Sequence, residues 1–431
     1  MNKFIPTLIL LLSLFGLASC QTQISKDVFS GWSTSEVKTL KTVNDDFTDL
    51  RAFGDAIGDK RIVMLDELTH GEGNIFALKS RLIEYLHKEK GFDVFAIESG
   101  IFDVHNIWQN EKTPIAQQAP GNIFYMYANS KEVIPLFNYI DSTRSSDRPL
   151  ELAGFDGRLS GELSKNMLTA KFAEYLKSKS LSDEQRSTWE GFSTMASDLL
   201  NGKLNDATPE VQDRFFQGVS QLRDVLADDR VPSSDPYNSD SYWRQITDSL
   251  AKMAEVYWGI KEFHEHDLVM ADNIDWMLTK AYPNKKIILW GHYIHLNKYG
   301  NYAESLTNPD KPASEYTRVD NLTSALAKKW KDEIYVAHFT GSHGSYIEFR
   351  DMNTGHFSTR DKALLENIIK PENSDTAVFV DTSTTDLNAP ELNKIKVWSH
   401  EYKTKMPLRD APDYWDGVFI FPQITPVDYN Y

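Results

Sequence analysis

KRIVMLDELTHG at residues 60–71 opens the stretch of sequence that decides the fold. Residues 60–67 are rich in strand-forming side chains, and the apolar residues that follow recur at helical spacing over about 74–90. Gly91 comes next, as is typical of a helix C-cap. FDVFAIE at 92–98 is almost continuously apolar, which is typical of a strand buried on both faces. The stretch therefore predicts a β-α-β unit.

Similar strand patterns recur along the rest of the chain and alternate with helical ones. We predict an α/β fold with a mostly parallel sheet and helices on both faces, because strands that alternate with helices pair in parallel. The further strands are expected at 150–155, 285–290, 333–339, 377–380 and 418–421.

The middle of the chain has no convincing strand pattern between about 160 and 282. Its apolar residues follow helical spacing in five segments, and the polar, proline-containing residues 228–240 form a loop. We interpret this region as an α-helical insertion that covers the cleft at one rim of the sheet. The five helices are expected at 163–176, 183–200, 209–227, 241–257 and 267–281.

The composition is that of a folded, acidic protein. Of the 431 residues, 41% are hydrophobic and 25% are charged, which excludes a wholly disordered chain and a membrane protein with several spans. The net charge of −16, without a local basic patch, argues against nucleic acid as a partner because like charges repel. Nothing in the sequence indicates an oligomeric state.

The N-terminus has the features of a secretory signal. A short positive segment precedes an apolar run at 5–17, and LASC, which ends at Cys20, resembles a bacterial lipobox. We expect a signal peptide at 1–19, a lipidated Cys20 with a tether over 20–33, and a folded domain over 34–425, with an ordinary signal peptide as the alternative. Acyl chains would then anchor the protein in the bacterial cell envelope, at the outer membrane or the cell surface. Since Cys20 is the only cysteine, the mature chain can form no internal disulfide, thiolate metal site or cysteine nucleophile.

Carboxylates end three of the predicted parallel strands: Glu67, Glu98 and Asp156. His70 lies one turn beyond the first of them. His292 follows the strand that ends at residue 290, and His295 follows three positions later. Because the carboxyl ends of parallel strands meet in one crevice, we expect these side chains to lie close together. Imidazoles beside carboxylates can perform general acid–base chemistry, since a carboxylate orients the imidazole and raises its basicity.

Structural roles stay open for several of these residues. Asp156, before a glycine, could cap a helix. Glu67 and Glu98 are each too costly to bury alone and could pair with Lys79 or Arg81. The other eight histidines are interpreted as structural or solvated, with a role at the rim of the cleft left open for the two near residue 340. They are His87, His105, His264, His266, His338, His343, His356 and His400.

Several motifs resemble those of the erythromycin esterase family. RIVMLDELTHG at 61–71, FALK at 76–79 and FAIE at 95–98 match its pattern of a strand, Gly-Glu-x-Thr/Ser-His-Gly, a helix with a basic residue, and a second strand ending in Glu. Further blocks follow in the family's order, so that the resemblance spans about residues 45–425. They are GFDG at 154–157, MADN at 270–273 with Trp276, WGHYIH at 290–295 and WDGVF at 415–419.

The resemblance implies hydrolysis of the macrolactone ester of a macrolide antibiotic such as erythromycin, without a cofactor, a metal ion or a covalent intermediate. A histidine matching His70 would activate the attacking water, Glu67 and Glu98 would orient and stabilise it, and His292 and His295 would complete the cleft. The residues agree with the use of water, because the chain contains no Gly-x-Ser-x-Gly nucleophile elbow.

Other positions near these motifs either match the family or depart from it. Lys79 matches a basic position, which implies that it stabilises the developing oxyanion. Asp66 replaces a glycine and is expected to add a carboxylate at the mouth of the cleft, Tyr293 replaces an asparagine, and Asn74 stands where many members have an acidic residue. We expect Asp66, Tyr293 and Asp156 to contact the substrate. The departures from the family are therefore expected to alter substrate specificity more than the hydrolytic chemistry.

Two alternative functions remain. Glu67, His70, Glu98, His292 and His295 could hold a catalytic zinc ion with an open position for water, although their spacing matches no compact metal motif. A non-catalytic surface lipoprotein could instead bind a glycan or small molecule in an aromatic cleft. The rings available for stacking are Trp108, Tyr125, Tyr127, Trp258 and Trp276.

Overall fold

The computed structural model describes the chain from residue 32 to residue 429 with short gaps. The described ranges are 32–42, 45–232, 234–302, 317–369, 371, 373–382 and 390–429. The predicted signal peptide, Cys20 and nearly all of the predicted tether lie outside the described residues. Within these ranges, no helix combines the length and apolar character that crossing a membrane requires.

The centre of the fold is an eight-stranded sheet in which the strands from β14 to β4 run parallel, and β11 alone runs in the opposite direction, antiparallel to both of its neighbours, β1 at the edge and β14. The predicted α/β class is therefore confirmed. All four residues of β2 are fully buried, as the apolar run predicts. In spatial order the strands are β1 (Thr34–Lys38), β11 (Thr376–Asp381), β14 (Gly417–Phe421), β8 (Ile334–Gly341), β2 (Ile62–Leu65), β5 (Lys286–Trp290), β3 (Phe92–Gly100) and β4 (Glu151–Asp156).

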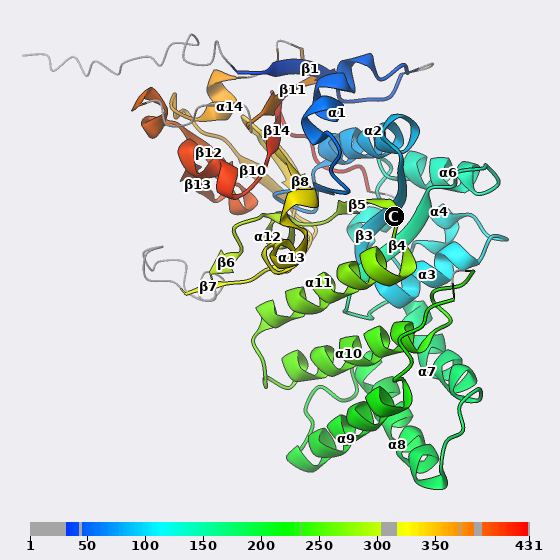
Figure 1. The fold of residues 1–431 in the computed structure, drawn as a ribbon. Coiled ribbons are helices and arrows are strands. Elements are labelled where there is room, and N and C mark those ends of the chain that lie inside the picture. The colour runs from blue at the N-terminus through cyan, green and yellow to red at the C-terminus, as the bar shows by residue number, and fades with distance from the viewer. Residues whose placement is uncertain are drawn as a thin grey trace, which may run out of the picture.

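Helices cover both faces of this sheet (Figure 1). The first β-α-β unit forms as predicted, and α2 ends at Gly91, whose φ of 75° is the left-handed conformation that glycine adopts without a Cβ clash. One face carries α1 (Arg51–Ile57), α2 (Gly73–Lys90) and α6 (Ile134–Thr143), and the other carries α3 (Ile101–Gln109), α11 (His266–Trp276) and α13 (Leu322–Trp330). The short helices α4 (Ile115–Gln118) and α5 (Tyr125–Ala128) lie between α3 and α6 in the chain.

Four of the five helices expected in the insertion project beyond the sheet, drawn in green in Figure 1, whereas the fifth, α11, packs on a face of the sheet. Ser182 accepts a hydrogen bond from the backbone of Gln185 and so caps α8, and Ser239 caps α10. The helices are α7 (Glu162–Leu176), α8 (Asp183–Leu200), α9 (Pro209–Val225) and α10 (Asp240–Tyr257), followed by α11.

Short elements in the last third of the chain were not predicted. Three two-stranded hairpins and two one-turn helices contain too few residues to show a period in the sequence. The hairpins are β6 (Asn301–Tyr302) with β7 (Arg318–Val319), β9 (Gly344–Ile347) with β10 (Thr354–Phe357), and β12 (Lys396–Ser399) with β13 (Thr404–Pro407). The short helices are α12 (Tyr293–Leu296) and α14 (Leu365–Ile368). Beyond the predicted domain end at 425, Pro426 and Tyr429 still form bridges with Glu72 and Ser130.

The buried carboxyl of Glu72 ties the C-terminal part of the chain to the start of α2. One of its oxygens accepts a hydrogen bond from the hydroxyl of Tyr402, and the other accepts one from the backbone N–H of Thr69 at 3.2 Å. Burial raises the pKa of Glu72 from 4.5 to about 8. Between these two pH values the folded chain binds one more proton than the unfolded chain. The free energy of unfolding therefore falls as the pH rises from about 4.5 to about 8.

We predict that Glu72→Gln removes this loss of stability. Glutamine keeps the size and an accepting oxygen but does not ionise, so the variant should be close to the wild type at about pH 5 and more stable at about pH 9, by on the order of 2 kcal/mol. Urea unfolding at the two pH values measures the difference. An equal loss of stability with rising pH in both proteins would contradict the role given to Glu72.

Candidate active site

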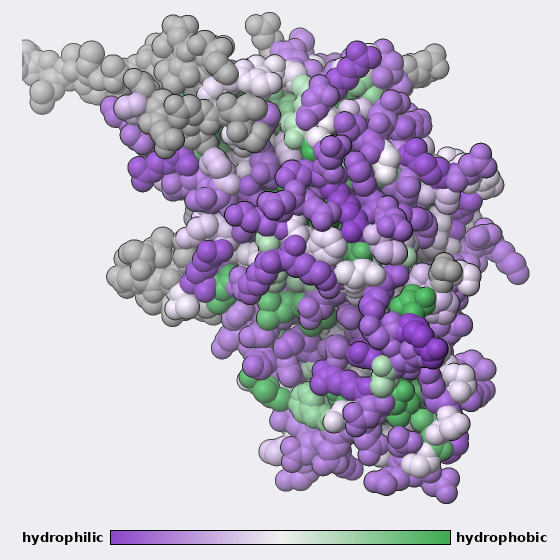
Figure 2. Space-filling view, viewed as in Figure 1, coloured by the Kyte–Doolittle hydropathy of each residue, from purple (hydrophilic) through white to green (hydrophobic). Residues whose placement is uncertain are grey.

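A cleft of about 760 Å³ opens at the carboxyl ends of the parallel strands. Its floor includes His70, Glu98 and His295, and one wall comes from the insertion, through Tyr257 and Phe263. These two side chains are 45% and 49% exposed. In Figure 2 a green apolar patch lies over the connection between α10 and α11 on a mostly hydrophilic face. The insertion therefore supplies an apolar rim to a cleft whose floor is polar.

The Glu67 carboxylate, just beyond β2, lies at the centre of a buried hydrogen-bond network. Oε1 is 2.8 Å from Nδ1 of His70 and accepts a hydrogen bond of 2.7 Å from the Tyr127 hydroxyl. Oε2 accepts hydrogen bonds of 2.7 Å from Nζ of Lys79 and from the indole N–H of Trp290. Side chains from β2, α2, α5 and β5 thus meet at one carboxylate.

This network determines the charge of Glu67 and the tautomer of His70. Burial alone would raise the pKa of Glu67, but Lys79 and His70 outweigh burial and lower that pKa to about 2. The ionised carboxylate can only accept hydrogen bonds, so Nδ1 of His70 donates to it and, in the neutral ring, Nε2 keeps its lone pair. No hydrogen bond from the described residues reaches Nε2, and His70 lines the cleft.

Aromatic rings hold the imidazole of His70 in place. Phe124 and Phe349 pack edge-on against it, with centroid distances of 4.7 and 4.9 Å, and the ring of His292 lies at 4.6 Å. Such packing leaves the imidazole little rotational freedom and excludes water from its faces. The side chain is therefore preorganised with one nitrogen available to the cleft.

Glu98, near the end of β3, contacts groups from two other segments, α12 with its N-cap and the loop after β4. Oε2 accepts a hydrogen bond of 2.7 Å from the backbone N–H of His292, and Oε1 lies 3.5 Å from Nε2 of His295 and 3.6 Å from the guanidinium of Arg158. Gly291 allows this close approach, because a Cβ there would be 2.8 Å from Oε2 of Glu98. The carboxylate of Asp156 accepts hydrogen bonds from the backbone N–H and the guanidinium of Arg158. Asp156 is therefore not the N-cap of α7, which begins six residues later. The side chain of Arg158 is 36% exposed and lines the cleft.

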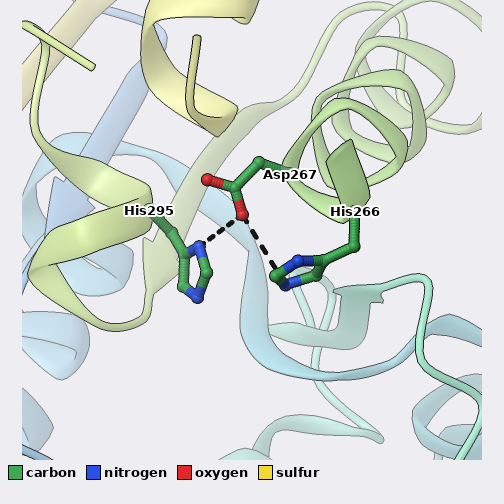
Figure 3. Close-up of side chains that lie close together, drawn as sticks. All are labelled: His266, Asp267 and His295. Carbon is green, nitrogen blue, oxygen red and sulfur yellow. Dashed lines mark hydrogen bonds and ion pairs between the residues drawn. The ribbon is translucent and has the colours of Figure 1, made fainter. Parts of the chain in front are cut away.

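His295, on α12, is the second imidazole of the cleft and has the opposite electrostatic environment. Its Nδ1 lies 2.6 Å from Oδ1 of Asp267 on α11, and Figure 3 shows Asp267 between the rings of His295 and His266. Burial alone would lower the pKa of His295, but Asp267 and Glu98 outweigh burial and raise that pKa to about 9. His295 is therefore an imidazolium at neutral pH.

The group in Figure 3 also has the donor atoms of a cation site. Atoms of His266, Asp267 and His295 lie within 4.8 Å of one another. Nδ1 of His266 lies 2.8 Å from the carbonyl of Phe263, and its Nε2 has no hydrogen-bond partner among the described residues. Two imidazoles and a carboxylate suit a transition metal such as zinc. This group shares only His295 with the five ligands considered from the sequence.

His292 supports the site from behind and does not line the cleft. Its Nε2 lies 3.1 Å from the carbonyl of Leu68, and its Nδ1 accepts from the N–H of Ile294 at 3.3 Å as the N-cap of α12. Burial lowers the pKa of His292 well below its usual range, and His70 and His295 add to this effect. Both nitrogens of His292 are therefore engaged, and its ring packs against His70. The expectation that His292 completes the cleft is not met, because its side chain does not line it.

The structure also corrects three other expected roles. Lys79 is fully buried, with its Nζ bonded to Glu67 and lying 4.8 Å from the centroid of Trp290, so it cannot reach an oxyanion in the cleft. Asp66 is buried beneath the sheet edge, where it binds Nδ1 of His338 at 2.8 Å, and does not lie at the mouth. Tyr293 is buried, with its hydroxyl 3.4 Å from the hydroxyl of Ser399, and Ile294 lines the cleft in its place.

Sequence reasoning missed Arg158, Asp267 and the role of Tyr127. Arg158 follows the GFDG block directly, but an exposed arginine after a strand is common and gave no signal. Asp267 did give a signal, because it shares a helix face with the buried Met270 and Ile274, and a charge on an apolar face needs a partner.

Arg81, considered as a partner for Glu67 or Glu98, instead pairs with Asp45 and Asp49. Of the other rings considered for stacking, Tyr125 lines the cleft. The three tryptophans have structural partners: Trp276 and Trp258 donate to Ser241 and to the carbonyl of Leu204, and the guanidinium of Arg144 lies 4.1 Å from the ring of Trp108.

Comparisons with known proteins extend over most of the chain. The sequence profile described as erythromycin esterase matches residues 87–394. The Bacillus subtilis (strain 168) protein described as "Putative hydrolase YbfO" is 26% identical over 466 residues, which cover 98% of this chain and 97% of that protein.

Two solved structures share the fold. One, a Bacillus cereus protein, gives a TM-score of 0.71 at 16% identity and covers 94% of this chain and 98% of its own. The other, a mutant of the erythromycin esterase EreC in its open conformation, gives a TM-score of 0.61 at 17% identity and covers 93% and 99%. Because the family profile matches well over half of the chain, this protein belongs to the erythromycin esterase family.

Proposed function

We propose that this protein hydrolyses an ester bond by direct attack of water, with the macrolactone of a macrolide such as erythromycin as the first candidate substrate. The observation that carries the proposal is the His70 imidazole, which is bonded to an ionised carboxylate through Nδ1 and has Nε2 available to a cleft. This pairing is the standard requirement for a general base.

His70 performs the first proton transfer. A water molecule beside Nε2 adds to the ester carbonyl carbon while its proton passes to Nε2, and Glu67 stabilises the imidazolium that forms. The bond between the carbonyl carbon and the alcohol oxygen then breaks, and the proton on His70 passes to the departing alkoxide. The products are an acid and an alcohol, and no enzyme side chain forms a covalent bond.

His295 supplies the positive charge that the reaction needs. Its imidazolium and the half-buried guanidinium of Arg158 line the same cleft as His70. A fixed cation in a site that excludes water stabilises the oxyanion of the tetrahedral intermediate more than the neutral ester. Lys79 and Tyr127 act as positioning residues, because they touch Glu67 and not the cleft.

The dimensions of the cleft and its rim support a bulky, partly apolar ester. A volume of about 760 Å³ falls within the range that accommodates drug-sized ligands, and Tyr257 and Phe263 present apolar surface at its entrance. Family membership makes a macrolide the first compound to test. We further propose that Cys20 is lipidated and that the protein acts at the bacterial cell envelope.

We predict that the protein adds one water molecule to erythromycin, as a mass increase detected by mass spectrometry, and that His70→Ala lowers kcat/KM by at least about 10²-fold, because the base is lost. His356→Ala, which removes an exposed histidine on β10, is the matched control and should keep full activity.

Two further samples separate the alternatives. A chelator-treated wild type that loses activity, with recovery on adding one metal, would favour a cation held by His266, Asp267 and His295. Absence of a mass change with erythromycin and with a panel of simpler esters would contradict ester hydrolysis, and tight ligand binding without turnover would favour a binding protein.

We predict that the pH profile of kcat/KM reports the proton on His295. The reaction needs the imidazolium, so activity should be present below about pH 9 and fall as the pH rises through the pKa of His295. Asp267→Asn removes the anion that raises this pKa and should move the alkaline limb to lower pH by roughly one unit or more. An alkaline limb that stays in place in this variant would contradict the assignment.

A further inference from the structure

A second cleft, of about 640 Å³, lies between the core helix α3 and the insertion. It is bounded by α3, the second half of α7, residues 235–238 and the start of α10, and it shares no lining residue with the active-site cleft. The family chemistry and the proposed hydrolysis do not use it.

Aromatic side chains in fixed orientations form much of the lining. The imidazole of His105 stacks on Tyr237 with a centroid distance of 3.8 Å and an interplanar angle of 8°, and Tyr242 packs edge-on against Tyr237 at 5.0 Å. Trp243 also lines the cleft, and Phe172 stacks on it at 4.5 Å. Fixed rings of this kind bind flat apolar surfaces, including the C–H faces of sugar rings, at little cost in conformational entropy.

Polar groups without protein partners surround these rings. The Tyr242 hydroxyl is buried, in a side chain only 2% exposed, and has no hydrogen-bond partner among the described residues. Burial lowers the pKa of His105 to about 3, so that its ring is neutral and offers one donor and one acceptor, and no described residue hydrogen-bonds to it. The exposed amides of Gln109 and Asn238 also line the cleft and add further donors and acceptors.

The charges around the second cleft are mixed and do not select an ion. Lys171 donates a hydrogen bond to Asn106, and Glu174 pairs with Lys177, so two of the charged groups are already engaged. Asp235 is the remaining charged side chain in the lining. A ligand with many hydroxyl groups and no net charge matches this combination of rings and amides better than a cation, an anion or an apolar molecule.

We propose that the second cleft binds a neutral saccharide, whose ring packs against the half-buried rings of His105 and Tyr175 and whose hydroxyl groups pair with the exposed amides of Gln109 and Asn238. The site is separate from the hydrolytic cleft. Glycan binding in an aromatic cleft was one interpretation of the sequence, but none of the rings expected there lines this one.

Isothermal titration calorimetry of the full-length protein with maltotriose, cellotriose and chitotriose tests the proposal. We expect at least one of the three to bind, and Gln109→Ala/Asn238→Ala to weaken its affinity by about tenfold or more, since hydrogen bonds from two side chains are lost. Both side chains are exposed, so the double variant should fold, and an unchanged thermal transition will show that it does.

The matched control is Asn205→Ala/Gln217→Ala, which removes the same two kinds of exposed amide from the insertion outside either cleft. It should bind like the wild type. Failure of all three trisaccharides to bind, or equal affinity in the two double variants, would overturn the proposal. Binding that is lost in His70→Ala instead would place the sugar in the hydrolytic cleft and would also overturn it. None of these results depends on ester hydrolysis.

Discussion

The buried carboxylate of Glu67 is the interaction on which the rest of the site depends. Four donors from separate elements converge on its two oxygens, and none of them is available to solvent to any large extent. An unpaired buried carboxylate would be too costly to keep, and the ammonium of Lys79 offsets that cost within the protein. The same contacts join β2, α2, α5 and β5, so the packing of these elements also orients the His70 imidazole.

The two imidazoles of the cleft are differentiated by their neighbours. His70 faces a carboxylate whose charge is already balanced by Lys79, whereas His295 lies between Asp267 and Glu98. The first ring presents Nε2 to the cleft, whereas the raised pKa of the second, about 9, keeps positive charge on His295 at neutral pH. Residues of the same type acquire different chemical roles because Asp267, the carboxylate bonded to His295, pairs with no lysine or arginine of the described residues, whereas Glu67 pairs with Lys79.

The insertion serves both clefts through the same helices. Glu162 and Lys165 at the start of α7, with Tyr257 at the end of α10, line the hydrolytic cleft. Lys171 later on α7 and Trp243 at the start of α10 line the second cleft. Because α7 packs against α3 and α10 packs against α11, the packing of the insertion on the core helices positions both clefts.

The sequence by itself determined the parallel α/β core, the helical insertion and the strand ends that bring Glu67, Glu98 and Asp156 together, because these features depend on local periodicity and on the direction of parallel strands. It could not determine which side chains face the cleft. Lys79, Asp66 and Tyr293 are buried although motif position suggested contact with substrate. Arg158 and Asp267 reach the site by long-range packing of β4 and α11. Only the tertiary structure decided these roles, because the direction of a side chain and the charge of its neighbours depend on elements that are distant in the chain.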